Sequence, residues 1–74
     1  MSFRDIVKEA LLKNGGYSVE SKYSSMHSDI DKVGDVWIVY FFDRCGHSVS
    51  NKEEFRTMDA ALDEYVKRTE HWND

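Results

Sequence analysis

Cys45 and His47 are the first side chains in this sequence of 74 residues that could perform chemistry, because a thiol beside an imidazole can form a thiolate nucleophile. They flank Gly46, in the segment from Asp43 to Gly46 whose residues predict a tight turn with Gly46 in the left-handed conformation. A catalytic cysteine also needs a third group that orients its base and a pocket that holds a substrate. A turn between two strands offers neither, so we expect no catalytic residue here.

Metal binding is the second chemistry that these residue types permit. Cys45, His47, His27 and His71 are the candidate ligands, but none of them falls in the paired spacing of a structural zinc site. The chain has one cysteine, which excludes a disulfide within it. We therefore expect neither a metal nor a cofactor.

Acidic side chains form two groups that invite comparison with a pair of catalytic carboxylates. One group is Glu53 with Glu54, and the other is Asp59 with Asp63 and Glu64. General acid–base catalysis requires a carboxyl in a dry pocket that raises its pKa. These acids fall in a predicted loop and on the polar face of a predicted helix, where solvated charge is the expected role. The sequence therefore predicts a protein that is not an enzyme.

The net charge of −4 lies entirely in residues 34–74, because acidic and basic groups balance in residues 1–33. An acidic protein gains little from the attraction to phosphate that dominates nucleic-acid binding. Direct binding to DNA or RNA is therefore disfavoured, and a basic surface of another protein is the partner that we expect.

We also expect a cytoplasmic protein with no membrane segment. The charged N-terminus does not resemble a signal peptide. The longest apolar run, from Val36 to Phe42, is far shorter than the roughly 20 residues that span a bilayer. A single thiol fits a reducing compartment.

A first amphipathic helix is predicted from about Phe3 to Lys13 by apolar residues that recur on one helical face. Ser2 is a suitable N-cap. The residues Asn14-Gly15-Gly16 tolerate the left-handed backbone that ends many helices.

A second helix is predicted near the C-terminus, with Thr57 as its N-cap. Ser50 with Glu53 is a rival capping box that would start this helix earlier. Its apolar stripe, which Trp72 can extend, comprises Met58, Ala61, Leu62, Tyr65, Val66 and Thr69.

Strands are predicted between the helices. Alternation from Tyr17 to Tyr23 and the β-branched and aromatic run from Val36 to Phe42 indicate two strands, and residues 47–50 indicate a short return strand. Residues 24–35 have no clear period, and we expect a long loop with one helical turn at most. The chain is thus predicted to be a single α+β domain over residues 1–74, in the order helix, three-stranded antiparallel sheet, helix (αβββα), with both helices on one face of the sheet.

These strands carry more aromatic surface than two helices can cover. Because side chains alternate along a strand, half of the run from Val36 to Phe42 must point away from the helices, whichever register it adopts. Exposed aromatic surface on a small domain commonly marks an interface. The alternative is that the loop of residues 24–35 folds over that face with its apolar residues.

The order helix, three strands, helix resembles the double-stranded RNA-binding domain in topology. That family carries a lysine-rich motif at the start of its last helix, where the helix dipole also attracts phosphate. The corresponding stretch here, Thr57 to Glu64, has three acidic residues and no basic one, so it would repel phosphate. RNA binding is therefore an alternative that only the topology supports.

The function that the sequence favours is a non-catalytic protein-binding module, a small inhibitor or adaptor that occupies a basic surface of a partner such as a nucleic-acid-binding protein. Small inhibitors from phages and mobile elements, including anti-CRISPR-type proteins, are similar in size and charge. A homodimer that buries the uncovered sheet face against its twin is an alternative. The predicted interface consists of three aromatic anchors and four acidic rim residues: Trp37, Tyr40, Phe41, Asp35, Asp43, Glu53 and Glu54.

Overall fold

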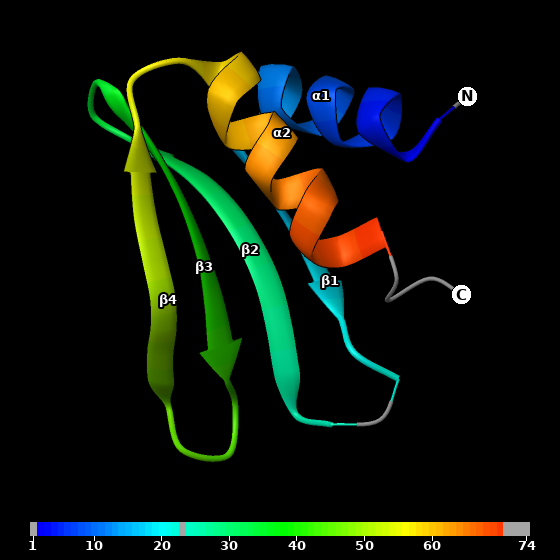
Figure 1. Cartoon of the computed structure of the whole chain (residues 1–74), viewed down its shortest axis with the longest axis vertical. Coiled ribbons are helices and arrows are strands. Elements are labelled where there is room, and N and C mark those ends of the chain that lie inside the picture. The colour runs from blue at the N-terminus through cyan, green and yellow to red at the C-terminus, as the bar shows by residue number, and fades with distance from the viewer. Residues whose placement is uncertain (1, 23, 71–74) are drawn as a thin grey trace.

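A computed structural model describes residues 2–22 and 24–70 of the chain. It contains helix α1 (Phe3–Asn14), strands β1 (Gly16–Glu20), β2 (Met26–Val33), β3 (Val36–Asp43) and β4 (Ser48–Phe55), and helix α2 (Met58–Thr69). The strands form one antiparallel sheet in the order β1-β2-β3-β4 (Figure 1). The protein is a small α+β domain, as the sequence predicts.

The sheet has four strands where the sequence predicts three, because the expected loop at residues 24–35 contains β2. This strand pairs with β1 on one side and with β3 on the other. Its inward residues include Ile30 and Ser28, both fully buried, and its outward residues up to Asp31 are histidine and aspartate. Residues 26–33 form a strand because they pair with β1 and β3, although they contain too few apolar residues to show an alternating pattern.

The two edge strands also differ from their predicted bounds. β1 ends at Glu20, and Tyr23, the predicted end of that strand, lies outside the described residues. β4 continues beyond the predicted end at Ser50 as far as Phe55, and all its residues except Phe55 are exposed. An exposed edge strand shows no apolar alternation that would reveal its length. The fourth strand makes the order αββββα, which differs from that of the double-stranded RNA-binding domain.

The predicted helix ends are confirmed by the capping geometry. Ser2 and Thr57 are N-caps, and each side-chain oxygen accepts a hydrogen bond at 3.2 Å from the backbone amide three residues later. Gly15 follows α1 with a left-handed φ of 74°. The rival start at Ser50 is wrong, because β4 occupies that position, and Trp72 lies outside the described residues.

The turn between β3 and β4 lies where the sequence predicts it, but its left-handed residue is His47, with φ of 51°, and not Gly46. Asn51 in β4 is also left-handed, with φ of 53°. It belongs to a β-bulge in which Asn51 and Lys52 together oppose Tyr40.

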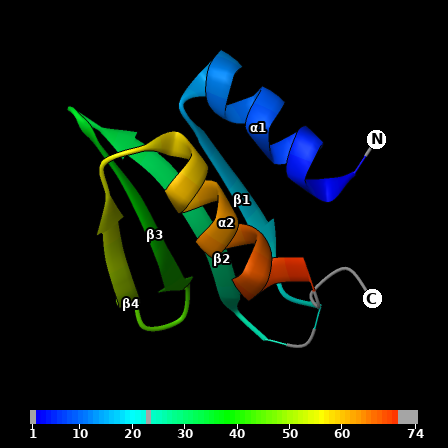
Figure 2. The ribbon, with the colours of Figure 1, turned by 45° about the horizontal axis from the view of Figure 1, so that its top comes forward.

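Both helices pack on one face of the sheet, and one core joins the two layers (Figure 2). Tyr65 of α2 lies at its centre, fully buried, with its ring centroid 6.3 Å from that of Phe3 and 6.2 Å from that of Tyr17. The Tyr65 hydroxyl donates to the Ser28 carbonyl of β2 at 2.7 Å, and burial raises the pKa of this phenol, so it stays a donor. The buried members of the core are Val7, Leu11, Ile30, Val39, Ala61, Leu62 and Tyr65.

The hydrogen bond from Tyr65 gives a first prediction about stability. Tyr65→Phe should lower the free energy of unfolding by about 1–2 kcal/mol, because it removes a donor from a buried carbonyl while keeping the ring. Tyr17→Phe, at a half-buried ring of the same cluster, should cost less than half as much. Urea denaturation of both variants measures the difference, and an unchanged Tyr65→Phe variant would contradict the assigned role.

Candidate protein-binding face

The sheet has a face that the helices cover and a face that they leave open. Val39 of β3 points into the core beneath the helices, so Trp37 and Phe41 point to the same side. Both helices lie on that side of the sheet (Figures 1 and 2). The alternate residues of β3, Val36, Ile38, Tyr40 and Phe42, therefore point to the opposite surface. We call that surface the open face, and it comprises Ser18, Glu20, His27, Asp29, Asp31, Val36, Ile38, Tyr40, Phe42, Val49, Lys52 and Glu54. The alternative in which residues 24–35 fold over that face is wrong, because β2 lies within the sheet.

The centre of the open face is apolar. Ile38, Tyr40 and Phe42 form a row along β3, and Val49 and Lys52 of β4 complete a shallow depression of about 410 Å³. Val49 is 53% exposed, whereas Ile38 is only 8% exposed. Contiguous apolar surface framed by polar residues is typical of a protein-binding surface.

An acidic row on β2 borders this depression. Asp29 lies directly opposite Tyr40 in the strand pairing, and Asp31 accepts a hydrogen bond from the Tyr40 hydroxyl at 2.5 Å. Burial of the phenol, and then this hydrogen bond, raise the pKa of Tyr40 far above its ordinary value, so the hydroxyl remains a donor. Oδ1 of Asp29 and Nε2 of His27 are buried and have no hydrogen-bond partner among the described residues.

A second depression, of about 510 Å³, lies at one end of the open face and brings together two predicted rim residues. Asp35, in the turn between β2 and β3, and Glu54 of β4 line it together with Val36, Phe55 and Arg56. Val36 and Glu54 also belong to the open face. The acidic side chains of the open face therefore extend from Asp31 of β2 to Glu54 at this end of β4.

Trp37 and Phe41, two of the three predicted anchors, lie on the covered face and are half-buried. The Lys32 amino group lies 5.6 Å from the centroid of the Trp37 ring, and the Arg68 guanidinium lies 5.3 Å from that of Phe41. Both registers of β3 satisfy the sequence pattern, and the burial of Val39 decides between them. Of the predicted anchors, the structure places Tyr40 on the open face.

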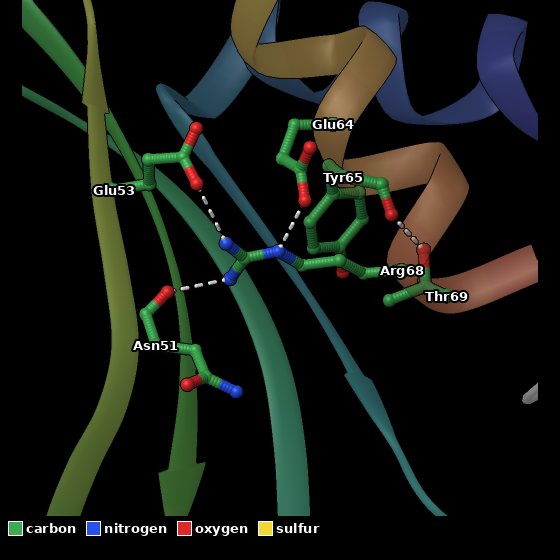
Figure 3. A network of polar contacts seen from close by, with 6 residues as sticks. All are labelled: Asn51, Glu53, Glu64, Tyr65, Arg68 and Thr69. Atoms are coloured by element: carbon green, nitrogen blue, oxygen red, sulfur yellow. Dashed lines mark hydrogen bonds and ion pairs between the residues drawn. The ribbon is translucent and has the colours of Figure 1, made fainter.

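Glu53, a predicted rim residue, takes part in a network centred on Arg68 (Figure 3). The Arg68 side chain reaches from α2 to β4 and is 11% exposed. It donates from Nε to Glu64 at 2.7 Å and from Nη1 to the Asn51 carbonyl at 2.7 Å, and Nη2 lies 3.4 Å from Glu53. Arg68 therefore holds the bulge of β4 against α2, and Glu53 is engaged within the protein.

Asp43, the remaining predicted rim residue, also has internal partners. Its carboxylate accepts hydrogen bonds from the Ser25 hydroxyl at 2.7 Å and from the Cys45 amide at 3.0 Å. These hydrogen bonds hold the pKa of Asp43 below its ordinary value. Cys45 is exposed beside it, and the ring of His47 lies 6.4 Å from that of Phe42. The turn thus uses Asp43 to fix its backbone.

Comparison of the chain with protein families, with curated proteins and with solved structures finds no match. Within residues 2–22 and 24–70, no three histidine, cysteine or acidic side chains lie together so as to hold a metal ion, and His71 lies outside those residues. Neither helix of the described chain combines the length and apolar character that crossing a bilayer requires.

Sequence reasoning missed Asp29, Asp31 and Phe42 as members of the candidate site. The available signal was the spacing of His27, Asp29 and Asp31, which a strand would place on one face. This spacing indicates a shared face only if the segment is already known to be a strand, since the same residues are equally typical of a loop.

The Arg68 network predicts a large effect on stability. Arg68→Ala should lower the free energy of unfolding by about 2–3 kcal/mol, because it leaves Glu64 and the Asn51 carbonyl without a buried donor. Lys67→Ala removes the same charge from the adjacent exposed position and should cost under about 0.5 kcal/mol. Guanidinium denaturation compares the two, and equal effects would show that Arg68 is an ordinary surface residue.

The hydrogen bonds to Asp43 predict a pH dependence. Because the folded pKa is depressed, the stabilisation is complete above the ordinary aspartate value of 3.8 and is lost as the pH falls through the lower folded value. A carbon NMR titration of the Asp43 carboxyl should have its midpoint below 3.8, and Ser25→Ala should move it upward. Ser50→Ala, on the exposed edge strand, should leave the midpoint unchanged. A Ser25→Ala midpoint equal to that of the unmodified protein would refute this account.

Proposed function

We propose that this protein is a non-catalytic binding module that occupies a basic surface of a partner protein through the open face of its sheet. The observation that carries the proposal is an apolar row along β3 bordered by the aspartates of β2, on the side that the helices leave uncovered. Desolvated aromatic and apolar side chains supply most of the affinity of such interfaces. Flanking charges select the partner and speed the encounter.

The charge of the open face favours a basic partner. Asp29, Asp31 and Glu54 lie on it, and Lys52 is a cation of the same surface. Glu20 is matched by Arg44, at 2.5 Å, and so adds little to the net charge. The resulting acidic surface suits a nucleic-acid-binding protein, whose binding site is basic. An inhibitor or adaptor of such a protein, of the kind that phages and mobile elements use against host defences, is the form of the proposal that we favour.

The contact residues that we propose are the side chains of the open face and its acidic border. Trp37 and Phe41 support β3 from the covered side, and Asp43 and Glu53 have partners within the protein. The proposed anchors are Tyr40 and Phe42, beside the nearly buried Ile38, with acidic residues Asp29, Asp31, Asp35 and Glu54 around them.

Two alternatives fit this surface less well. A homodimer formed through the open face would bury the carboxylates of two copies in one interface, where their desolvation is costly. Direct RNA binding would place phosphates against the same carboxylates. Both alternatives therefore require the acidic border to be neutralised by other groups.

The proposal predicts which truncations abolish binding. Phe42→Ala and Tyr40→Ala, made separately, should weaken capture of the partner from an extract of the organism that encodes the protein by at least about tenfold, as a hot-spot loss of about 1.4 kcal/mol requires. Leu12→Ala is the matched control, because Leu12 is an apolar residue of α1 that is 70% exposed and lies outside the open face.

The measurement is a quantitative pull-down with mass spectrometry, on variants whose circular dichroism shows an intact fold. Equal capture by the unmodified protein and by both open-face variants would remove the proposal. A partner lost with Leu12→Ala and kept with the other two would place the binding surface on the helices.

A further inference from the structure

Asp29, Tyr40 and Asp31 form a row of half-buried side chains at the border between the apolar depression and the acidic edge of the open face. The Tyr40 hydroxyl donates to Asp31, which fixes the ring beside both carboxylates. The ion pairs found among the described residues involve arginines elsewhere in the fold, and none of them reaches Asp29 or Asp31. The row thus carries two negative charges that the described part of the protein does not pair with a cation.

This arrangement leaves hydrogen-bonding capacity unused. Partly desolvated carboxylates are costly unless donors or cations compensate them. Oδ1 of Asp29 has no hydrogen-bond partner among the described residues, and neither has Nε2 of the adjacent His27. A cation with several donors, brought against the parts of Asp29 and Asp31 that face solvent, would compensate both carboxylates.

We infer that the partner protein presents an arginine to this row, with its guanidinium against the Tyr40 ring and its N–H groups directed at Asp29 and Asp31. The inference rests on the proposed function of the open face and names the group that the face recognises. A guanidinium is planar, weakly hydrated and carries five donors, so it can stack on an aromatic ring while it binds carboxylates. The ammonium group of lysine is a strongly hydrated point charge that does not stack in this way.

The neighbouring depression defines what lies beside that arginine. Ile38 and Phe42, which flank Tyr40 along β3, line it together with Val49 of β4, and it is open enough to receive an apolar side chain. Lys52 of β4 stands on the side of Tyr40 opposite β2, which further confines an incoming cation to the aspartate row. The occupant is therefore a segment of the partner in which an arginine adjoins an apolar residue.

Amide NMR of the nitrogen-labelled protein, titrated with hexaarginine and separately with hexalysine, tests the inference. Hexaarginine should shift the amides of residues 27–31 and 38–42, with an affinity at least about threefold above that of hexalysine, which corresponds to roughly 0.65 kcal/mol. In the double variant Asp29→Asn with Asp31→Asn, the affinity for hexaarginine should fall at least about fivefold. Asparagine keeps an acceptor for the Tyr40 hydroxyl, so the fold should be retained.

The matched control is the double variant Glu9→Gln with Glu70→Gln, which removes the same charge from exposed positions at the two helices. It should weaken hexaarginine binding less than about twofold. Should the double aspartate variant lose its dispersed spectrum, Asp29→Asn alone serves, because Asp29 is not the acceptor at 2.5 Å from Tyr40.

Three results would overturn the inference. They are equal affinity for the two peptides, equal loss in the two double variants, and shifts of the same amides on dilution of the protein without peptide, which would assign the face to a second copy. If arginine recognition fails while Phe42→Ala still abolishes partner capture, the proposed function stands and the arginine assignment alone falls. If capture is insensitive to both Phe42→Ala and Tyr40→Ala, the proposed function falls whatever the peptides do.

Discussion

The pairing of Ile30 with Val39 at the centre of the sheet determines where most other side chains lie. Both residues are fully buried beneath the helices, and side chains alternate along each strand. Their burial therefore sends Asp29, Asp31 and Tyr40 to the opposite face. A slip of one residue would place the two carboxylates beneath α2 and expose Ile30, at the cost of burying unpaired charge. The core and the open face are thus two consequences of a single register.

Two arginines on the helical side of the sheet form contacts within the protein. Arg4 of α1 pairs with Asp63 of α2, and Arg68 of α2 joins Glu64 to the backbone of β4. Because these arginines are committed to contacts within the helical layer and its edge strand, they do not offset the acidic residues on the far side of the sheet. Because these arginines lie on the helical side, the aspartates of β2 form a distinctly acidic border on the open face although the net charge of the chain is only −4.

The parts of the fold that the sequence predicts are those governed by local signals. N-caps at Ser2 and Thr57 and an apolar helical stripe define both helices without reference to the rest of the chain. β2 was not predicted because its burial depends on pairing with β1 and β3, which no local pattern in its own residues indicates. The choice of face in β3 was also out of reach, since the run from Val36 to Phe42 is apolar on both sides and only contacts with the helices distinguish them. For the candidate site, this meant that Tyr40 was found and Phe42 was not.

Tyr40 makes the apolar centre and the acidic border of the open face a single surface. Its ring lines the depression with Ile38 and Phe42, while its hydroxyl holds Asp31. Charge acts at long range and apolar contact at short range, so a basic partner would be oriented by the aspartates before it excludes water from the depression. An apolar surface without that border would accept many partners, and an acidic border without the apolar centre would bind weakly and lose affinity with salt. Specificity on a chain this small requires both properties to meet at the same residue, and the register of β3 with β2 brings them together.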